Sequence, residues 1–258
     1  MNSISLLNKN IKIFKIIILS LLLFFSFQFN VKAVTFCNSL TNNGNVTINQ
    51  TDSFCFYGHS GNGSNSSGAA DNATFTNNGT ITLRHRNVYG YHISFNNVKM
   101  INNGTINTSA GDNQEYLNPF ADSGDNTEIT NNGTINLNYG VSGGKGNSKA
   151  FRMVNGNGQS FTNSIGASVT VIGRDNLPGG MIQNDNTTVT NNGTFTIGGN
   201  GTTQQAIRYY DTTDGHTLIN TGTLTQNGST DAILNEGTNV VITNTGTING
   251  ATYDINNT

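Results

Sequence analysis

The sequence predicts an all-β fold: a right-handed parallel β-helix, or β-solenoid, of about eight rungs, preceded by a signal peptide. Three observations support this prediction. Asn, Thr and Gly number 45, 35 and 31 among the 258 residues. A short motif recurs eight times, with Asn-Asn-Gly in five copies and Asn-Thr-Gly or Asn-Ser-Ile-Gly in the others, and periods of roughly 20–50 residues are typical of solenoids. Within each copy, apolar and polar residues alternate as they do along a half-buried strand.

The low charge excludes other classes of protein. Charged residues make up 10% of the chain, against roughly 25% in ordinary globular domains. This is too little for a nucleic-acid-binding protein, and disordered chains usually carry a high net charge. The sequence also lacks the usual content of helix-forming residues, and it lacks the Leu-rich heptads of a coiled coil.

The N-terminus has the pattern of a secretory signal peptide. Lys9, Lys12 and Lys15 precede an apolar run over 16–29, and Val31-Lys32-Ala33 supplies small residues for cleavage. The run is shorter than the about 20 residues that span a membrane. We therefore predict cleavage; an uncleaved membrane anchor is the alternative.

Cleavage between Ala33 and Val34 would give a signal peptide over 1–33 and a mature solenoid domain over 34–258. The mature part holds eight Lys and Arg against all 14 Asp and Glu, a net charge of −6. An acidic, polar, exported chain is a poor match for DNA or for anionic lipid head groups.

Both cysteines, Cys37 and Cys55, follow shortly after the predicted cleavage site. An even number of cysteines in an exported protein indicates a disulfide. The bond would close a loop of about 18 residues and contribute roughly 3 kcal/mol. We expect it to staple a cap on the N-terminal end of the stack; two unpaired buried thiols are the alternative.

Each copy of the motif begins with an apolar residue, passes through Asn and Gly, and ends in alternating polar and apolar residues. The eight copies are Leu40–Ile48, Phe75–Leu83, Met100–Thr108, Ile129–Leu137, Phe161–Val169, Val189–Ile197, Leu218–Thr225 and Ile242–Asn249. Their glycines are Gly44, Gly79, Gly104, Gly133, Gly166, Gly193, Gly222 and Gly246. The fifth copy carries an insertion.

A short apolar burst precedes each motif after the first by roughly a dozen residues. The bursts are Phe54–Tyr57, Tyr91–Phe95, Pro119–Ala121, Ala150–Val154, Gly180–Ile182, Ala206–Tyr209 and Ala232–Leu234. We therefore predict about three short strands in each repeat. In the second copy we expect Phe75, Ile81 and Leu83 to face inward, and Thr80 and Thr82 to face outward.

The Asn-Asn-Gly step is predicted to be a corner of the coil. Asn and Gly tolerate the left-handed backbone conformation that sharp turns use. Stacked rungs lie about 4.8 Å apart, so equivalent asparagines could form a hydrogen-bonded ladder, as in cross-β structures. The predicted ladder residues are Asn77, Asn102, Asn131, Asn191, Asn220 and Asn244.

Hairpins and a propeller are the competing folds. Asn-Gly between apolar runs is a strong hairpin signal, and a propeller blade uses four strands in roughly 40 residues. The runs that flank Asn-Gly are short here, and the repeats are too short for blades. Both facts favour a stack of parallel coils.

The repeat resembles the passenger repeats of bacterial autotransporters. The likeness rests on the Asn-Asn/Ser/Thr-Gly-Thr-Ile motif and on the bursts at Ala206-Ile207 and Ala232-Ile233, and it covers residues 40–249. Members of this family are exported through the inner membrane and displayed at the outer surface as β-helices. Related repeats occur in two-partner secreted exoproteins and filamentous haemagglutinins. The resemblance implies a secreted, outer-membrane or cell-surface location, reached through the periplasm, and a structural or adhesive role.

Autotransporters also carry a translocator β-barrel. No segment of this sequence shows the alternating strands of about ten residues that build such a barrel. Three explanations stay open: a fragment of a longer chain, a truncated passenger, or release by another route. In the first case the barrel would lie outside this sequence.

The sequence carries no nucleophile-elbow, metalloprotease or phosphate-loop motif, so we predict no catalysis, no metal and no cofactor. His85 and His92 are expected to be exposed loop residues. A secreted enzyme acting on polysaccharides is the alternative, because glycoside hydrolysis uses two carboxylates about 5–9.5 Å apart. The candidate pairs are Asp122 with Asp125, Asp211 with Asp214, Asp185 with Asp211, and Asp211 with Asp231.

An ice-binding solenoid is a further alternative. Outward Thr pairs recur at 80/82, 194/196 and 223/225, with Thr/Asn pairs at 105/107, 134/136 and 247/249. Such Thr-x-Thr arrays resemble ice-binding surfaces. The uneven repeat lengths and the exchange of Thr for Asn argue against a match to the ice lattice.

Display of variable loops on a rigid stack is the favoured function, because binding residues usually lie on loops held by a scaffold. The expected loops are the inserts Ser60–Asn72, Arg84–Asn97, Ser109–Asn126 and Gly140–Gly158. By resemblance, the expected partners are host or neighbouring-cell surfaces, or glycans. Neither nucleic acid nor a membrane span in the mature chain is expected.

Overall fold

The computed structural model describes residues 35–50, 53–59, 65–84, 87–108, 117–138, 149–172, 178–198 and 205–258. The chain divides into two compact units, 1–32 and 33–258, and every described residue belongs to the second. The predicted signal peptide and its cleavage site at Ala33 and Val34 therefore lie outside the described residues. The described part contains 24 β-strands and no helix.

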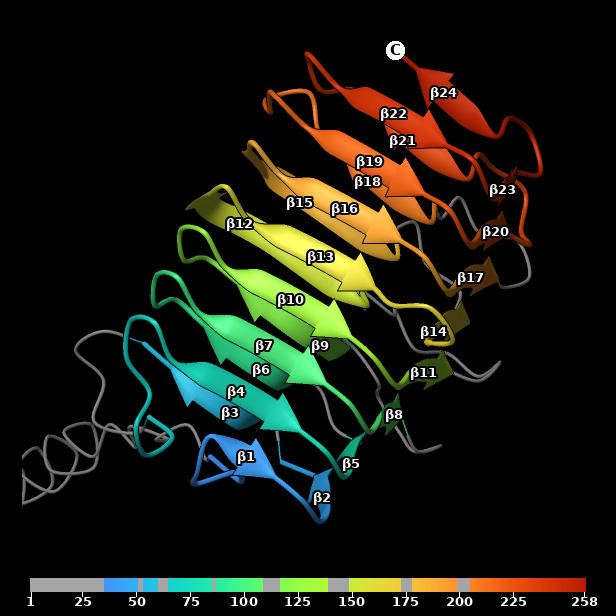
Figure 1. Cartoon of the computed structure of the whole chain (residues 1–258). Helices are drawn as coiled ribbons and strands as arrows, with labels where there is room; N and C mark the ends of the chain where they lie inside the picture. Colours follow the sequence, from blue (N-terminus) through green and yellow to red (C-terminus); the bar gives the residue numbers. More distant parts are fainter. Residues whose placement is uncertain are drawn as a thin grey trace, which may run out of the picture. The chain divides into compact units, whose positions relative to one another are not determined.

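The strands form three parallel sheets, and each coil of the chain adds one strand to each sheet (Figure 1). Sheet 1 contains β1 (Thr41–Asn42), β4 (Thr74–Asn77), β7 (Lys99–Asn102), β10 (Glu128–Asn131), β13 (Ser160–Asn163), β16 (Thr188–Asn191), β19 (Thr217–Asn220) and β22 (Val241–Asn244). Sheet 2 contains β2 (Asn45–Ile48), β5 (Thr80–Leu83), β8 (Thr105–Thr108), β11 (Thr134–Asn138), β14 (Ser168–Ile172), β17 (Thr194–Gly198), β20 (Thr223–Gln226) and β23 (Thr247–Asn249). Sheet 3 contains β3 (Ser53–Gly58), β6 (Val88–Ile93), β9 (Leu117–Asp122), β12 (Phe151–Asn157), β15 (Gly180–Asp185), β18 (Ile207–Tyr209), β21 (Ile233–Asn235) and β24 (Ile255–Asn257).

The chain thus winds through sheets 1, 2 and 3 in turn, eight times, which confirms the predicted parallel β-helix of eight rungs with three strands in each. The predicted apolar bursts fall in sheet 3 from β3 to β21. The eighth strand of that sheet, β24, was not expected, since Ile255 is the single strongly apolar residue in it.

Alternating burial shows which side chains fill the stack. In the second motif copy Phe75, Ile81 and Leu83 are fully buried, whereas Thr80 and Thr82 are partly exposed on the outer face. This confirms the inward and outward assignment predicted for that copy. The same alternation recurs in the strands above it, because a side-chain period of two places every second residue inside.

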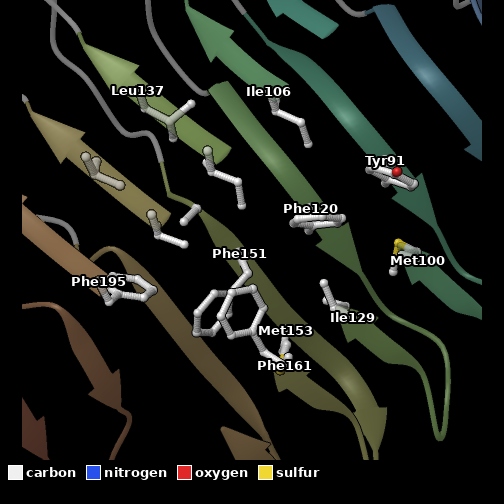
Figure 2. Packing of buried hydrophobic residues seen from close by; sticks show 14 of the residues in the cluster. Tyr91, Met100, Ile106, Phe120, Ile129, Leu137, Phe151, Met153, Phe161 and Phe195 are labelled. Atoms are coloured by element: carbon white, nitrogen blue, oxygen red, sulfur yellow. The ribbon is translucent and has the colours of Figure 1, made fainter. Parts of the chain in front are cut away.

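Equivalent core residues stack on one another along the solenoid. Phe75 is paired with Met100, and Met100 with Ile129. Rings also stack between sheets and coils: the centroids of Phe151 and Phe161 are 4.1 Å apart. Figure 2 shows these side chains filling the space between the sheets. Burial of such apolar surface at about 25 cal/mol per Å² stabilises the stack.

The corner between sheets 1 and 2 needs glycine for a reason other than the one predicted. Among the motif glycines, Gly166 alone has a positive φ, so the left-handed conformation does not explain the others. Instead, a methyl group at Gly79 would overlap the carbonyl oxygen of Gly44, and one at Gly104 would overlap that of Gly79. Close packing of one coil on the next therefore excludes a side chain at this position in the coils above the first that have a two-residue corner.

Gly166 itself is not a member of this column. Ser168 is paired with Thr134, and the backbone amide of Thr194 donates to Ala167 O. Ala167 thus takes the glycine's place in the fifth coil. Gly166 belongs to the inserted residues, at φ +79°, next to the 86% exposed Ile165.

Left-handed residues occur instead at the corner between sheets 3 and 1. From the second coil onward this corner contains a residue at positive φ, three positions before the first apolar motif residue. These residues are Asn72, Asn97, Asn126, Gly158, Asn186, Gly215 and Asn239. Asn and Gly are the residues that most readily adopt this conformation.

A disulfide between Cys37 and Cys55 fastens the first coil, as predicted. The amides of Phe36 and Cys37 donate to the carbonyls of Phe54 and Cys55. Residues 65–69 lie against the same end, where Ser66 Oγ donates to Cys37 O. Residues 36–38 and 65–69 therefore lie against the first strand of sheet 3 at the N-terminal end of the stack.

Candidate functional site

A ladder of asparagine side chains runs along the inside of the corner between sheets 1 and 2. Each Nδ2 donates to the Oδ1 of the next asparagine at 2.7–2.9 Å. The members are Asn42, Asn77, Asn102, Asn131, Asn163, Asn191, Asn220 and Asn244. The structure thus brings together all six predicted ladder residues and adds Asn42 and Asn163.

The ladder has a structural role. Its members from Asn77 to Asn220 are at most 1% exposed, whereas Asn244 in the last coil is exposed. Buried amides are costly unless they are hydrogen-bonded, and here each is held from both sides. A second, exposed ladder lies one residue further on, where Asn103 Nδ2 donates to Asn78 Oδ1 and Asn132 Nδ2 donates to Asn103 Oδ1.

The connectors from sheet 2 to sheet 3 vary in length from coil to coil. These eight segments are 49–52, 84–87, 109–116, 139–150, 173–179, 199–206, 227–232 and 250–254. The corner between sheets 1 and 2 has two residues in seven coils and four, 164–167, in the fifth. The connectors from sheet 3 to sheet 1 also differ in length, from 158–159 to 59–73, so the corner between sheets 1 and 2 is the one of nearly constant length.

The four predicted inserts need correction in this respect. Three of them contain a sheet 3 strand: β6 lies in Arg84–Asn97, β9 in Ser109–Asn126 and β12 in Gly140–Gly158. The predicted apolar bursts Tyr91–Phe95, Pro119–Ala121 and Ala150–Val154 mark these strands, but the expected insert ranges include them. In Ser60–Asn72 no strand occurs among the described residues 65–72.

Sheet 3 also differs from the other two sheets on its outer face. Phe54, Tyr57, His59, Tyr89 and His92 form an aromatic–histidine cluster on the first two coils. The ring of His92 stacks on Phe54 with centroids 5.0 Å apart and lies 4.6 Å from the ring of His59. Phe54 and Tyr57 are buried, and the other three rings are half-buried.

The expectation that His92 is an exposed loop residue is wrong: it lies on β6, because the strand occupies part of the predicted insert. Burial lowers the pKa of His92 to about 3, helped by the nearby charges of His59 and Arg152. Burial likewise lowers the pKa of His59. Both imidazoles are therefore neutral at pH 7. His85, the other predicted loop histidine, lies outside the described residues.

Two arginines follow this cluster along the outer face of sheet 3. Arg208 Nε donates to Glu236 at 2.8 Å, and the guanidinium lies 4.2 Å from the ring centre of Tyr210. Arg152 is half-buried on β12. Beside it, burial and the charge of Arg152 lower the pKa of Lys149 to about 8.

A buried polar network lies inside the corner between sheets 3 and 1. Gln159 Nε2 donates to Asp122 Oδ2 at 2.6 Å, and Asn184 Nδ2 donates to Gln159 Oε1 at 2.7 Å. Thr187 Oγ1 donates to Asn184, and the amide of Thr187 donates to His216 Nδ1. The five side chains are at most 6% exposed. The repeat pattern does not reveal the network, because its members differ in type from coil to coil.

Burial raises the pKa of Asp122 to about 7, although hydrogen bonds from Gly124, Thr127 and Ser123 act in the opposite direction. Burial also lowers the pKa of His216. A carboxyl with such a pKa is suited to proton transfer, but Asp122 is 2% exposed. The network therefore has no access to a substrate and serves the interior of the fold.

The carboxylates paired from the sequence differ in their burial and in their hydrogen bonds. Asp122 faces the interior, while Asp125 is exposed at the corner. Asp185 Oδ1 accepts from the amide of Asp214, so Asp185 is stacked under Asp214. These corner carboxylates satisfy the backbone of the next coil, and they are exposed.

The remaining pairs involve Asp211 and Asp231. Asp211 is exposed, whereas Asp231 is 8% exposed and accepts hydrogen bonds from the amide of Tyr253 and from Asn256. Asp231 thus lies in a connector on the edge between sheets 2 and 3, and Asp211 lies at the corner between sheets 3 and 1. The two are on different edges of the stack.

The Thr and Asn residues singled out from the sequence lie on the outer face of sheet 2. Thr80 is paired with Thr105, Thr105 with Thr134, and Thr194 with Thr223. The second column pairs Thr82 with Asn107, and Thr196 with Thr225. The uneven repeat lengths therefore do not disturb the register of this face.

The part of the chain that the structure describes contains no group of three or more His, Cys, Asp or Glu side chains arranged to hold a metal ion. Within the same residues, no helix has the length and apolar character needed to cross a membrane. No family model, curated protein or solved structure matches the chain. Function must therefore be argued from the architecture and its surfaces.

Proposed function

We propose that this protein is an exported β-helix that displays the connectors between sheets 2 and 3 for binding at the cell surface or in the secreted state, without catalysis. One observation carries the proposal. Length varies from 84–87 to 139–150 along this edge, while the corner between sheets 1 and 2 stays nearly constant. Segments that tolerate change on a rigid scaffold are where binding usually resides.

The stack suits this role because most of its stability lies outside the middle of the long connectors. Core stacking and the asparagine ladder lie mainly in the strands and at the corner between sheets 1 and 2, although connector residues next to sheet 3, such as Ala150, Ala206 and Ala232, also belong to the core. Solenoids are stabilised by contacts between neighbouring repeats. We therefore expect the middle of a long connector to tolerate a change of sequence without loss of the fold.

Export is supported by the basic and apolar residues of the N-terminus and by the disulfide, since disulfides persist in oxidising compartments. The resemblance to autotransporter passengers supports the same location and suggests host or neighbouring-cell surfaces, or glycans, as partners. Anchoring through a translocator barrel would need a segment outside this sequence.

Replacement of the connectors tests this proposal. Residues 109–116 and 139–148 would be exchanged for Gly-Ser segments of equal length, and Thr162→Ala with Thr190→Ala on sheet 1 would be the control. We expect both proteins to keep the β-sheet circular dichroism spectrum and thermal midpoint, while the connector variant loses adhesion to cells and retention on a glycan array. Adhesion that survives connector replacement would overturn the proposal.

A second candidate function, ice binding, is favoured by the register of sheet 2. The hydroxyl-bearing columns continue across coils of unequal length, and this removes one of the two arguments against it. Exchange of Thr for Asn at 107, 136 and 249 remains unfavourable. Thermal hysteresis of the purified protein, lost in Thr194→Tyr with Thr223→Tyr, would establish this activity; its absence would dismiss it.

A further inference from the structure

Positive charge is unevenly distributed over the described residues. Their cations are Arg84, Lys99, Lys149, Arg152 and Arg208. Lys99 lies on sheet 1 and is paired with Glu128 at 2.9 Å. Arg152 and Arg208 project from sheet 3, Lys149 immediately precedes β12, and Arg84 follows β5 in a connector. By contrast, Asp71, Asp125, Asp185 and Asp214 line the corner between sheets 3 and 1.

The two arginines of sheet 3 differ in their surroundings. Arg208 is neutralised by two hydrogen bonds to the carboxylate of Glu236. Arg152 has no ion pair with any described carboxylate, and it is half-buried rather than fully hydrated. Its charge lowers the pKa of both His92 and Lys149. Among the described residues, Arg152 is thus a cation of sheet 3 that is not paired with a carboxylate.

The aromatic–histidine cluster lies along the same column of the sheet. His92 is paired with Ala121, and Ala121 with Arg152, so two strand spacings, about 10 Å, separate His92 from Arg152. The small Ala121 stands between the two long side chains. Two nitrogen atoms of the cluster, His59 Nε2 and His92 Nδ1, are buried without a hydrogen-bond partner. Unsatisfied buried polar atoms are rare in native proteins, and each calls for an explanation such as a bound water, an ion or a functional role.

The imidazoles, the guanidinium and the aromatic rings on this face together match one chemical class of ligand. A neutral imidazole offers one donor and one acceptor, which suits the hydroxyl groups of a sugar. A guanidinium binds a carboxylate through two parallel hydrogen bonds. Aromatic rings supply apolar contact for the C–H groups of the sugar ring. A carboxylated saccharide presents all three features at comparable spacing.

We propose that the outer face of sheet 3 binds an extended carboxylated polysaccharide along the axis of the stack, with Arg152 holding a carboxylate and His59 and His92 holding sugar hydroxyls. This inference rests on the proposed function, because the connectors from sheet 2 join the strands of this face. It adds the ligand class and a binding surface on the strands themselves.

Direct binding to the full chain tests the inference. The probes are oligosaccharides of polygalacturonate, alginate and hyaluronan, each compared with its methyl-esterified, uncharged counterpart, by calorimetry in low salt. We expect at least one acid form to bind and its ester to bind at least tenfold more weakly. Binding to none of the three, or equal binding of acid and ester, would overturn the inference.

Variants assign the site. Arg152→Gln should weaken binding at least tenfold, while Lys99→Gln, which removes the same charge from sheet 1, should leave it unchanged. His92→Phe keeps the ring stacking but removes both nitrogens, so it should weaken binding without lowering the thermal midpoint. Equal losses in the Arg152 and Lys99 variants would indicate non-specific charge attraction and contradict the proposal.

Binding of other ligands and the combined results of both sets of variants distinguish the remaining outcomes. If duplex DNA or phosphatidylserine vesicles bind more tightly than any saccharide, the ligand is not a carboxylated saccharide and the inference is overturned. If connector replacement abolishes cell adhesion while Arg152→Gln does not affect saccharide binding, display by connectors stands and the sheet 3 site fails. If adhesion survives connector replacement but depends on Arg152, the sheet 3 site stands and display by connectors fails.

Discussion

The side-chain Nδ2 of Asn102 donates to Oδ1 of Asn131 at 2.8 Å, although the two residues are 29 positions apart and both are fully buried. The Nδ2 of Asn131 in turn donates to Oδ1 of Asn163 at 2.9 Å. A single amide thus satisfies a donor and an acceptor of two neighbouring coils. Hydrogen bonds in such a chain strengthen one another in a medium of low dielectric constant.

Removal of one ladder member should therefore be costly. Asn131→Ala deprives Asn102 of its acceptor and Asn163 of its donor, and each buried unsatisfied group costs about 1–3 kcal/mol. We expect the free energy of unfolding to fall by about 2–4 kcal/mol, measured by urea denaturation. The neighbouring Asn132→Ala is the control. Asn132 is exposed and belongs to the outer ladder, so a loss above about 0.5 kcal/mol there would contradict this account.

The glycine column makes a second prediction. A methyl group at Gly104 would overlap the carbonyl oxygen of Gly79 in the coil below, so the coils must separate locally. Gly104→Ala should lower the free energy of unfolding by about 1–3 kcal/mol or more, as overpacking does. Thermal and urea midpoints report the change.

Gly44→Ala is the matched control for this substitution. Gly44 holds the same motif position in the first coil, but no atom lies within 4 Å of the added methyl group. The substitution should be neutral, or stabilising by up to about 1 kcal/mol, since alanine restricts the unfolded chain. Equal losses at Gly44 and Gly104 would show that backbone conformation, and not contact between coils, selects glycine.

The sequence predicts most positions of the asparagine ladder, but the left-handed corner was not predicted from it. The ladder positions follow from a motif that repeats in every coil, so Asn77 and Asn131 could be assigned from spacing alone. Asn163 was missed because an insertion follows it. The left-handed corner was also missed, although pairs such as Asp125-Asn126 and Asp185-Asn186 stand three residues before the apolar motif position and could have revealed it.

The outer face of sheet 3 could not have been predicted in the same way. His59, His92 and Arg152 do not recur in every coil: the column that holds His92 continues through Ala121, Arg152, Met181 and Arg208. Their proximity depends on the register Tyr57–His92–Ala121–Arg152, which follows from connectors of unequal length. Asp122 and Gln159 were hidden for the same reason. Periodicity reveals the scaffold, whereas features found in single coils require the pairing of strands.

The disulfide is expected to protect the first coil in particular. Cys37 and Cys55 are separated by 18 residues, and loss of a link of that length costs roughly 3 kcal/mol in the loop-entropy model. Cys37→Ser with Cys55→Ser should increase amide hydrogen exchange over 35–58 while the coils from β10 onward keep their protection. Uniform deprotection of all coils would instead show that the stack unfolds as a single unit from this end.

Stability should also depend on pH through Asp122. Its pKa is about 7 in the folded state and 3.8 in the unfolded reference, so the folded protein holds this proton more tightly. The stabilising contribution is present below about pH 4 and is lost as the pH rises through 7. The difference corresponds to a few kcal/mol, at about 1.4 kcal/mol per pKa unit. His92 acts in the opposite direction. Its pKa is lowered in the folded state, so the folded protein loses stability relative to the unfolded chain as the pH falls below 6.5.

The Asp122 contribution is therefore measured as a difference between two proteins. Asp122→Asn cannot titrate, so the free energy of unfolding of the wild type relative to this variant should decrease between pH 5 and pH 8, while the histidine contributions cancel. A constant difference over this range would mean that Asp122 stays ionised in the fold. Its hydrogen bond from Gln159 at 2.6 Å would then outweigh the cost of burial.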